Sequence, residues 1–87
     1  MIKLLDKSKI DYVLNRVSRL YDVQLPIEFT SFEHNESANE LYVRFKNNGL
    51  IERSFRPKNH ITIEFDDSSQ IIAVKIGNIS DYLPKED

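Results

Sequence analysis

The stretch EHNESANELYVRF (residues 33–45) holds the densest group of side chains that could do chemistry. His34 and Glu40 are of types that bind metal ions or exchange protons, and Asn35 and Asn39 stand between them. An amide is a weak cation ligand and cannot act as a general base, but its oxygen caps main-chain amides in turns as a carboxylate does. We therefore interpret the cluster as a bend that joins two strands.

A second candidate for chemistry is the pair His34 and His60, the only histidines of the chain. If the strands that they begin were neighbours in a sheet, the two imidazoles would supply half of a metal site, but no third ligand is evident. The absence of cysteine removes thiolate metal sites, disulfides and cysteine nucleophiles together. We expect no metal and no cofactor.

Two further patterns argue against catalysis. The segment DDSSQ (residues 66–70) lacks the glycine and the later glutamate of a calcium loop, and its residue types are those of a hairpin turn. The serines show no nucleophile elbow, and the chain has no glycine-rich phosphate loop. We predict that the protein is not an enzyme, with no catalytic residue and no evident small-molecule substrate.

Charge is unevenly distributed along the chain. Residues 44–60 carry a net charge of +4, residues 61–87 a net charge of −4, and the whole chain −2. Tyr42, Arg44 and Lys46 share one face of a predicted strand, and Arg56 and Lys58 follow nearby. This pattern fits either a solvated cross-strand charge ladder or a platform for single-stranded nucleic acid.

A helix is predicted over about residues 8–22, with Ser8 and Asp11 as its capping residues and Pro26 limiting its end. Its apolar positions recur with helical spacing and form one stripe. They are Ile10, Val13, Leu14, Val17, Leu20 and Tyr21.

After Pro26 the apolar period changes to that of strands, over residues 27–32, 41–46, 51–56, 61–65 and 72–76. Asn47-Asn48-Gly49 predicts a tight hairpin, so we expect successive strands to pair as an antiparallel meander. The fold class is α+β: one domain (1–87) with an amphipathic helix packed on a four- to five-stranded sheet (27–77) and a short tail (78–87). We expect the inward side chains to be Leu41, Val43, Phe45, Phe55, Ile61, Ile63, Phe65, Val74 and Ile76.

The first predicted strand, IEFTSF (residues 27–32), has little to prevent pairing with another chain. We predict a protein-interaction domain of the accessory, inhibitor or immunity kind that binds a protein partner or itself as a homodimer, with weak nucleic-acid binding by the basic hairpin 42–58 as the alternative. The predicted partner-binding residues are Glu28, Phe32, Tyr42, Arg44, Lys46, Arg53 and Arg56. The first residues contain no signal peptide and no stretch approaches a membrane span, so we expect a cytoplasmic protein without a membrane partner.

Residues 34–82 resemble domain-of-unknown-function family 2283, a small bacterial family. HNESANELYV (34–43) is similar to the family's Y-D-x-x-A-D-x-L-Y-[IV], and ITIEFDDSSQIIAVKI (61–76) to its strand–turn–strand, with ISDYLP (79–84) where the family often has a short helical or turn segment. Asp66 is kept, whereas the family's first two aspartates are replaced here by Asn35 and Asn39, its two glycines by Ser69 and Ala73, and its glutamate by Lys75. The resemblance implies a small antiparallel sheet and no established activity.

Overall fold

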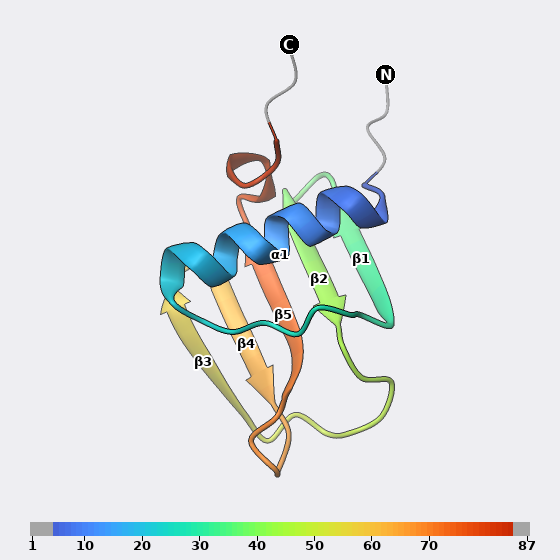
Figure 1. Ribbon diagram of the computed structural model, residues 1–87, viewed down its shortest axis with the longest axis vertical. Coiled ribbons are helices and arrows are strands. Elements are labelled where there is room, and N and C mark those ends of the chain that lie inside the picture. The colour runs from blue at the N-terminus through green and yellow to red at the C-terminus, as the bar shows by residue number, and fades with distance from the viewer. Residues whose placement is uncertain (1–4, 85–87) are drawn as a thin grey trace.

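The computed structural model describes residues 5–84 and shows an α-helix lying across one face of a five-stranded antiparallel sheet (Figure 1). The predicted α+β class, with the helix packed on the sheet, is thereby confirmed. Within residues 5–84, no helix is both long enough and apolar enough to cross a membrane. The elements in chain order are α1 (Lys7–Tyr21), β1 (Ser31–Asn35), β2 (Glu40–Arg44), β3 (Arg53–Lys58), β4 (Ile61–Phe65), β5 (Ile71–Gly77) and the 3-10 turn η1 (Ile79–Asp81).

The strand order is β1-β2-β5-β4-β3, which differs from the sequential order of a meander. The predicted hairpin at Asn47-Asn48-Gly49 is wrong, because β2 already lies between β1 and β5 and cannot pair with β3. Beyond the end of β2, the Phe45 amide donates to the Ile72 carbonyl (2.8 Å), so the chain continues along β5. Residues 45–52 then pass along the end of the sheet to its far edge (Figure 1). A type I′ turn needs positive φ at both central residues, and of residues 47–49 only Gly49 has one (φ 112°).

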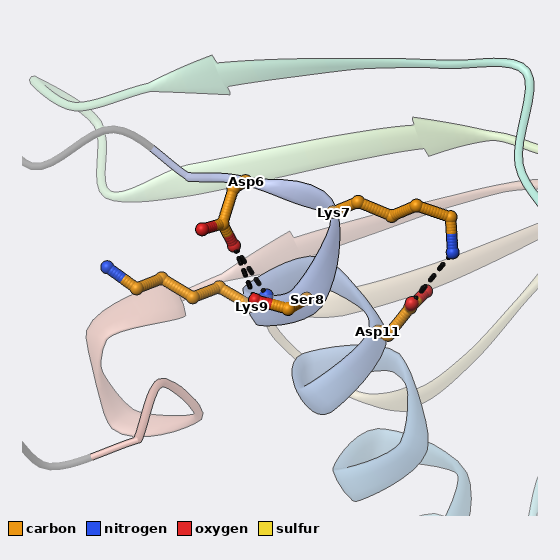
Figure 2. A network of polar contacts seen from close by, with 5 residues as sticks. All are labelled: Asp6, Lys7, Ser8, Lys9 and Asp11. Carbon is orange, nitrogen blue, oxygen red and sulfur yellow. Dashed lines mark hydrogen bonds and ion pairs between the residues drawn. The ribbon is translucent and has the colours of Figure 1, made fainter.

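Helix α1 begins one residue earlier than predicted, and its cap is Asp6. The Asp6 carboxylate accepts hydrogen bonds from the Lys9 amide (3.0 Å) and the Ser8 hydroxyl (2.7 Å), as Figure 2 shows. These bonds, the Lys9 amide foremost, hold the pKa of Asp6 below its ordinary value. The predicted cap by Ser8 and Asp11 is therefore wrong: Ser8 donates to the true cap, and Asp11 pairs with Lys7 at 2.9 Å. The helix ends as predicted, at Asp22 in left-handed conformation (φ 54°).

The core lies between α1 and the sheet. The buried residues of the helix are Ile10, Val13, Leu14 and Val17. They share one apolar cluster with alternate residues of the three central strands, which are Leu41, Val43, Ile61, Ile63, Val74 and Ile76. Because neighbouring residues of a strand point to opposite faces, the residues between these positions face away from α1. The sheet thus has a covered face and an open face.

Three sequence-based expectations differ from this core. Phe55 pairs with Ile63 on the covered side, but it lies on the edge strand β3 and is 55% exposed rather than buried. Leu20 of the helical stripe is exposed as well, since the helix is buried only along its central turns. The segment after residue 77 is more than a tail, because Ile79 and Tyr82 are buried in the core cluster.

The strand predicted over residues 27–32 begins later, at Ser31, and extends to Asn35. Ile27 is 86% exposed, and the segment between α1 and β1 crosses the covered face as an extended strap (Figure 1). Bonding to β2 begins only at Thr30, whose amide donates to the Arg44 carbonyl (2.8 Å). Its residues Leu25 and Phe29 pack on the core. Alternating apolar residues here indicate a strap over the core, because the chain must return across the sheet before pairing begins.

Candidate functional site

The polar cluster that follows β1 is a bend, as predicted. Residues 36–39 form the turn between β1 and β2. The Asn35 side-chain oxygen accepts a hydrogen bond from the Ala38 amide (3.1 Å), and the Asn39 amide donates to the Glu36 carbonyl (3.2 Å). The Asn35 side chain therefore holds main chain in place.

Asn39 joins this bend to the segment after β5. It adopts a left-handed conformation (φ 55°), which asparagine tolerates better than most residues. Its side chain donates to the Ser80 hydroxyl (3.0 Å) and accepts from the Ser80 amide (3.2 Å), while its carbonyl accepts from the Ile79 amide (3.0 Å). The amide side chain of Asn39 thus caps η1, a role the sequence did not indicate.

The two histidines lie far apart in the sheet. His34 belongs to β1 and His60 precedes β4, with β2 and β5 between those strands. The hypothesis that they begin neighbouring strands is therefore wrong. Among residues 5–84, no three histidine, aspartate or glutamate side chains are grouped so that they could hold a metal ion.

His60 instead belongs to a chain of hydrogen-bonded side chains that the sequence did not reveal. Its Nε2 lies 2.5 Å from the Tyr82 hydroxyl, which lies 2.6 Å from the Tyr21 hydroxyl. The rings of Tyr21 and Tyr82 meet edge to face with centroids 6.5 Å apart. Burial, followed by the hydrogen bond to Tyr21, raises the pKa of Tyr82 well above its ordinary value. A phenol that keeps its proton at neutral pH cannot serve as a base, so the geometry favours a structural link between α1, the β3–β4 turn and η1.

The turn at Asp66 also serves the main chain. Asp66 Oδ1 accepts from the Ser68 and Gln70 amides, both at 2.9 Å, and Ser69 has positive φ (63°). The Gln70 amide is the largest of the causes that hold the pKa of Asp66 below its ordinary value. The hairpin-turn interpretation of residues 66–70 is confirmed.

The residues predicted to bind a partner are distributed over several surfaces. Tyr42, Arg44 and Arg56 lie on the open face, as their alternation with buried residues and their cross-strand partners show. Tyr42 reaches across β5 and donates to Glu64 Oε1 (2.7 Å). Burial and then this bond raise the pKa of Tyr42.

The other predicted residues lie elsewhere. Arg53 is on the covered side, where its guanidinium carbon lies 4.9 Å from the centre of the Phe65 ring. Lys46 contacts the Asp66 turn, with its Nζ 3.7 Å from Oδ2 and hydrogen-bonded to the Gln70 side chain. Glu28 is exposed on the strap and Phe32 is on β1. The predicted basic hairpin 42–58 therefore does not form, and its cations do not make one platform.

Lys75 was not among the predicted residues, yet it lies near the centre of the open face. It pairs with Thr62 of β4 on one side and with Tyr42 of β2 on the other. Its Nζ is 3.7 Å from Glu40 Oε2. Thr62 in ITIEF and Lys75 in IIAVKI alternate with apolar residues, so the sequence indicates that both side chains point away from the core. Only the strand order shows that they lie beside Arg56.

A shallow hollow of about 280 Å³ opens at the end of this face, where the β3–β4 turn meets the end of β5. We name it the open-face hollow. Gly77 stands at its edge, and the Gly77 amide donates to the His60 carbonyl at 2.6 Å. The polar side chains that line the hollow are Glu40, Arg56, Asn59, His60, Thr62, Lys75 and Asn78.

The two edges of the sheet differ. At one edge, β3 contains Arg53, Arg56, Pro57 and Lys58, and its register with β4 is interrupted between Phe55 and Lys58. At the other edge, β1 (SFEHN) pairs with β2 in unbroken register and contains no proline, lysine or arginine. Proline, lysine and bulges are devices that prevent pairing between sheet edges, so only β3 is protected by them.

Comparison of the chain with protein-family models, curated proteins and solved structures finds no significant match. The resemblance of residues 34–82 to domain-of-unknown-function family 2283 therefore stays a prediction.

Proposed function

We propose that this protein is a small, non-enzymatic protein-interaction domain that associates through the outer edge of β1, with a second copy of the chain as its partner. The observation that carries the proposal is the asymmetry of the two edges. Edge β3 is protected by Pro57, an irregular register and basic side chains, whereas edge β1 has a regular ladder and none of these devices. An unprotected edge strand is a template for a further antiparallel strand.

An aromatic pair adds apolar surface to this edge. Phe32 of β1 is 40% exposed, and its ring meets that of Phe29 edge to face with centroids 6.0 Å apart. The side chain of Phe32 lies on the covered side of the sheet, since it is paired with the buried Val43. A strand added to β1 would remove part of this aromatic surface from water, which favours association.

Charge complementarity selects the register between two copies. The only fully charged side chain of β1 is Glu33, and an antiparallel arrangement centred on Glu33 would oppose two carboxylates. Centring the arrangement on Phe32 instead sets the two phenylalanines face to face and places Glu33 opposite the hydroxyl of Ser31. Centring it on His34 would set Phe32 against the turn residue Glu36 and leave its ring without an aromatic partner. The association is therefore centred on Phe32.

The oligomeric state in solution tests this proposal. Sedimentation and light scattering over a range of concentrations should show a reversible dimer, which Phe32→Glu should dissociate. Phe55→Glu is the matched control, because Phe55 is a similarly exposed aromatic residue on the covered side of the other edge strand. A monomer at every concentration, or a dimer lost in Phe55→Glu and kept in Phe32→Glu, would overturn the proposal.

Single cysteines test the register, since the natural chain contains none. With Phe32 opposite its counterpart, Phe32→Cys should form a disulfide-linked dimer in air, because opposing Cβ atoms of paired strands lie near the distance that a disulfide requires. Glu33→Cys and Phe55→Cys should remain largely uncross-linked. Failure of Phe32→Cys to cross-link at concentrations at which the natural protein is a dimer would contradict the register centred on Phe32.

A further inference from the structure

We propose that the open-face hollow is a binding site for the doubly charged oxyanion of a phosphate monoester, held between Arg56 and Lys75 above the Thr62 hydroxyl. The three side chains come from adjacent strands. Thr62 is the cross-strand partner of Lys75, and the Arg56 Nε donates to the Thr62 Oγ1 at 3.3 Å. Two long cationic side chains thus flank a short hydroxyl residue, which leaves a notch between them.

The cations of the notch are available to a ligand. Among residues 5–84, Arg56 makes no ion pair, and its hydrogen bond is to the neutral Thr62 hydroxyl. Within the same described part of the chain, Lys75 is paired only with Glu40 at 3.7 Å, and these side chains are 54% and 37% exposed. An ion pair that is this long and this exposed contributes little and is readily exchanged for a better partner.

The remaining lining suits a tetrahedral oxyanion. Asn59 and Asn78 also line the hollow, and the side-chain amide of each can donate hydrogen bonds to an oxyanion. A guanidinium binds phosphate oxygens through paired N–H groups, and an ammonium adds charge without a fixed direction. The volume of about 280 Å³ accommodates a phosphate group together with the atoms that carry it.

The class of phosphate follows from the charge of the lining. The lining carries a net charge of +1 from Arg56, Lys75 and Glu40. The coulombic attraction is therefore about twice as large for a dianion as for a monoanion. A phosphate monoester carries nearly two charges above its second pKa of about 6. A phosphodiester carries one, so the backbone of a nucleic acid should bind more weakly at this site.

Titration calorimetry and amide chemical shifts at pH 8 test the site with phenyl phosphate, inorganic phosphate and dimethyl phosphate. Phenyl phosphate and inorganic phosphate should saturate the site and shift the amides of residues 59–62 and 75–78, and dimethyl phosphate should bind more weakly. Arg56→Ala and Lys75→Ala should each weaken phenyl phosphate about tenfold, since a hydrogen bond to a charged group contributes about that much. Arg44→Ala is the matched control on the same face and should bind as the natural protein does.

The effect of Glu40→Gln on phenyl phosphate binding distinguishes a specific site from nonspecific attraction to the surface. Removing the competing carboxylate should tighten phenyl phosphate binding severalfold while the fold, measured by circular dichroism, stays unchanged. Binding that is equal in Arg56→Ala, Lys75→Ala and the natural protein would overturn the proposal. So would tighter, strongly salt-dependent binding of a single-stranded oligonucleotide than of phenyl phosphate, which would indicate a nucleic-acid surface instead.

Discussion

The hydroxyl of Tyr82, close to the end of the described chain, lies 2.6 Å from the hydroxyl of Tyr21 in the last turn of α1. Because Tyr82 also meets His60 Nε2 at 2.5 Å, one phenol oxygen joins three elements. Tyr82→Phe would leave two partly buried polar groups without this partner. We expect a loss of about 1–3 kcal/mol in the free energy of unfolding, measured by urea denaturation. Tyr12→Phe, an exposed tyrosine on the same helix, is the control and should change stability little.

The same tyrosine should make stability fall at high pH. Burial and the hydrogen bond to Tyr21 raise the pKa of Tyr82 in the folded state, whereas the unfolded chain keeps the ordinary value of about 10. The contribution is therefore complete below pH about 10 and is lost as the pH rises from there through the folded pKa. Urea denaturation between pH 8 and 11 should show this decline, with a smaller slope in Tyr82→Phe. Equal slopes in the two proteins would contradict the assignment.

Gly77 should not tolerate a side chain. A Cβ at this position would lie 3.2 Å from the Cβ of His60 and 3.3 Å from its carbonyl oxygen. That carbonyl is held by the Gly77 amide itself at 2.6 Å, so the backbone cannot move away without losing the bond. Gly77→Ala should lower the free energy of unfolding by about 1–3 kcal/mol, as overpacking does. A midpoint of urea denaturation equal to that of the natural protein would show that the turn at His60 moves freely.

Two substitutions distinguish the core from the edge of the same strand pair. Ile63 and Phe55 are cross-strand partners, yet Ile63 is fully buried and Phe55 is 55% exposed. Ile63→Ala should cost about 2–5 kcal/mol of stability through lost burial and the cavity left behind. Phe55→Ala should change stability by less than about 1 kcal/mol. Similar losses for the two variants would mean that α1 or another chain covers β3 in solution.

The local elements of this fold could be predicted from the sequence, whereas the order of the strands in the sheet could not. The helix, the two turns at residues 36–39 and 66–70 and four of the five alternating segments follow from local spacing and turn residues, and the structure confirms them. The fifth segment, residues 27–32, is mostly the strap that precedes β1. The strand order cannot be predicted from the sequence in the same way. An Asn-Asn-Gly segment indicates that the chain changes direction, but it does not show which strand will pair with the one before it. The position of β5 between β2 and β4 is a property of the whole sheet.

The candidate sites were harder to predict from the sequence, because they too depend on which strands are neighbours in the sheet. The hydrogen bond between Tyr21 and Tyr82 joins residues 61 positions apart, so no local sequence pattern predicts it. The sequence indicates only that Arg56, Thr62 and Lys75 point outward from separate strands. The strand order of the sheet is what makes them neighbours. By contrast, the role of Asn35 in the bend was predictable, since an asparagine cap acts within its own turn.

Asn39 offers a test of the bend itself, because its backbone conformation and its side chain make separable contributions. Asn39→Ala removes the two side-chain bonds to Ser80 and places a Cβ-bearing residue without a polar group at φ 55°. The combined loss should be about 2–3 kcal/mol in urea denaturation. Asn39→Gly removes the bonds without the conformational strain and should lose about 1 kcal/mol. Asn39→Asp keeps an oxygen that accepts from the Ser80 amide and should lose least, so an aspartate variant as unstable as the alanine one would refute the capping role.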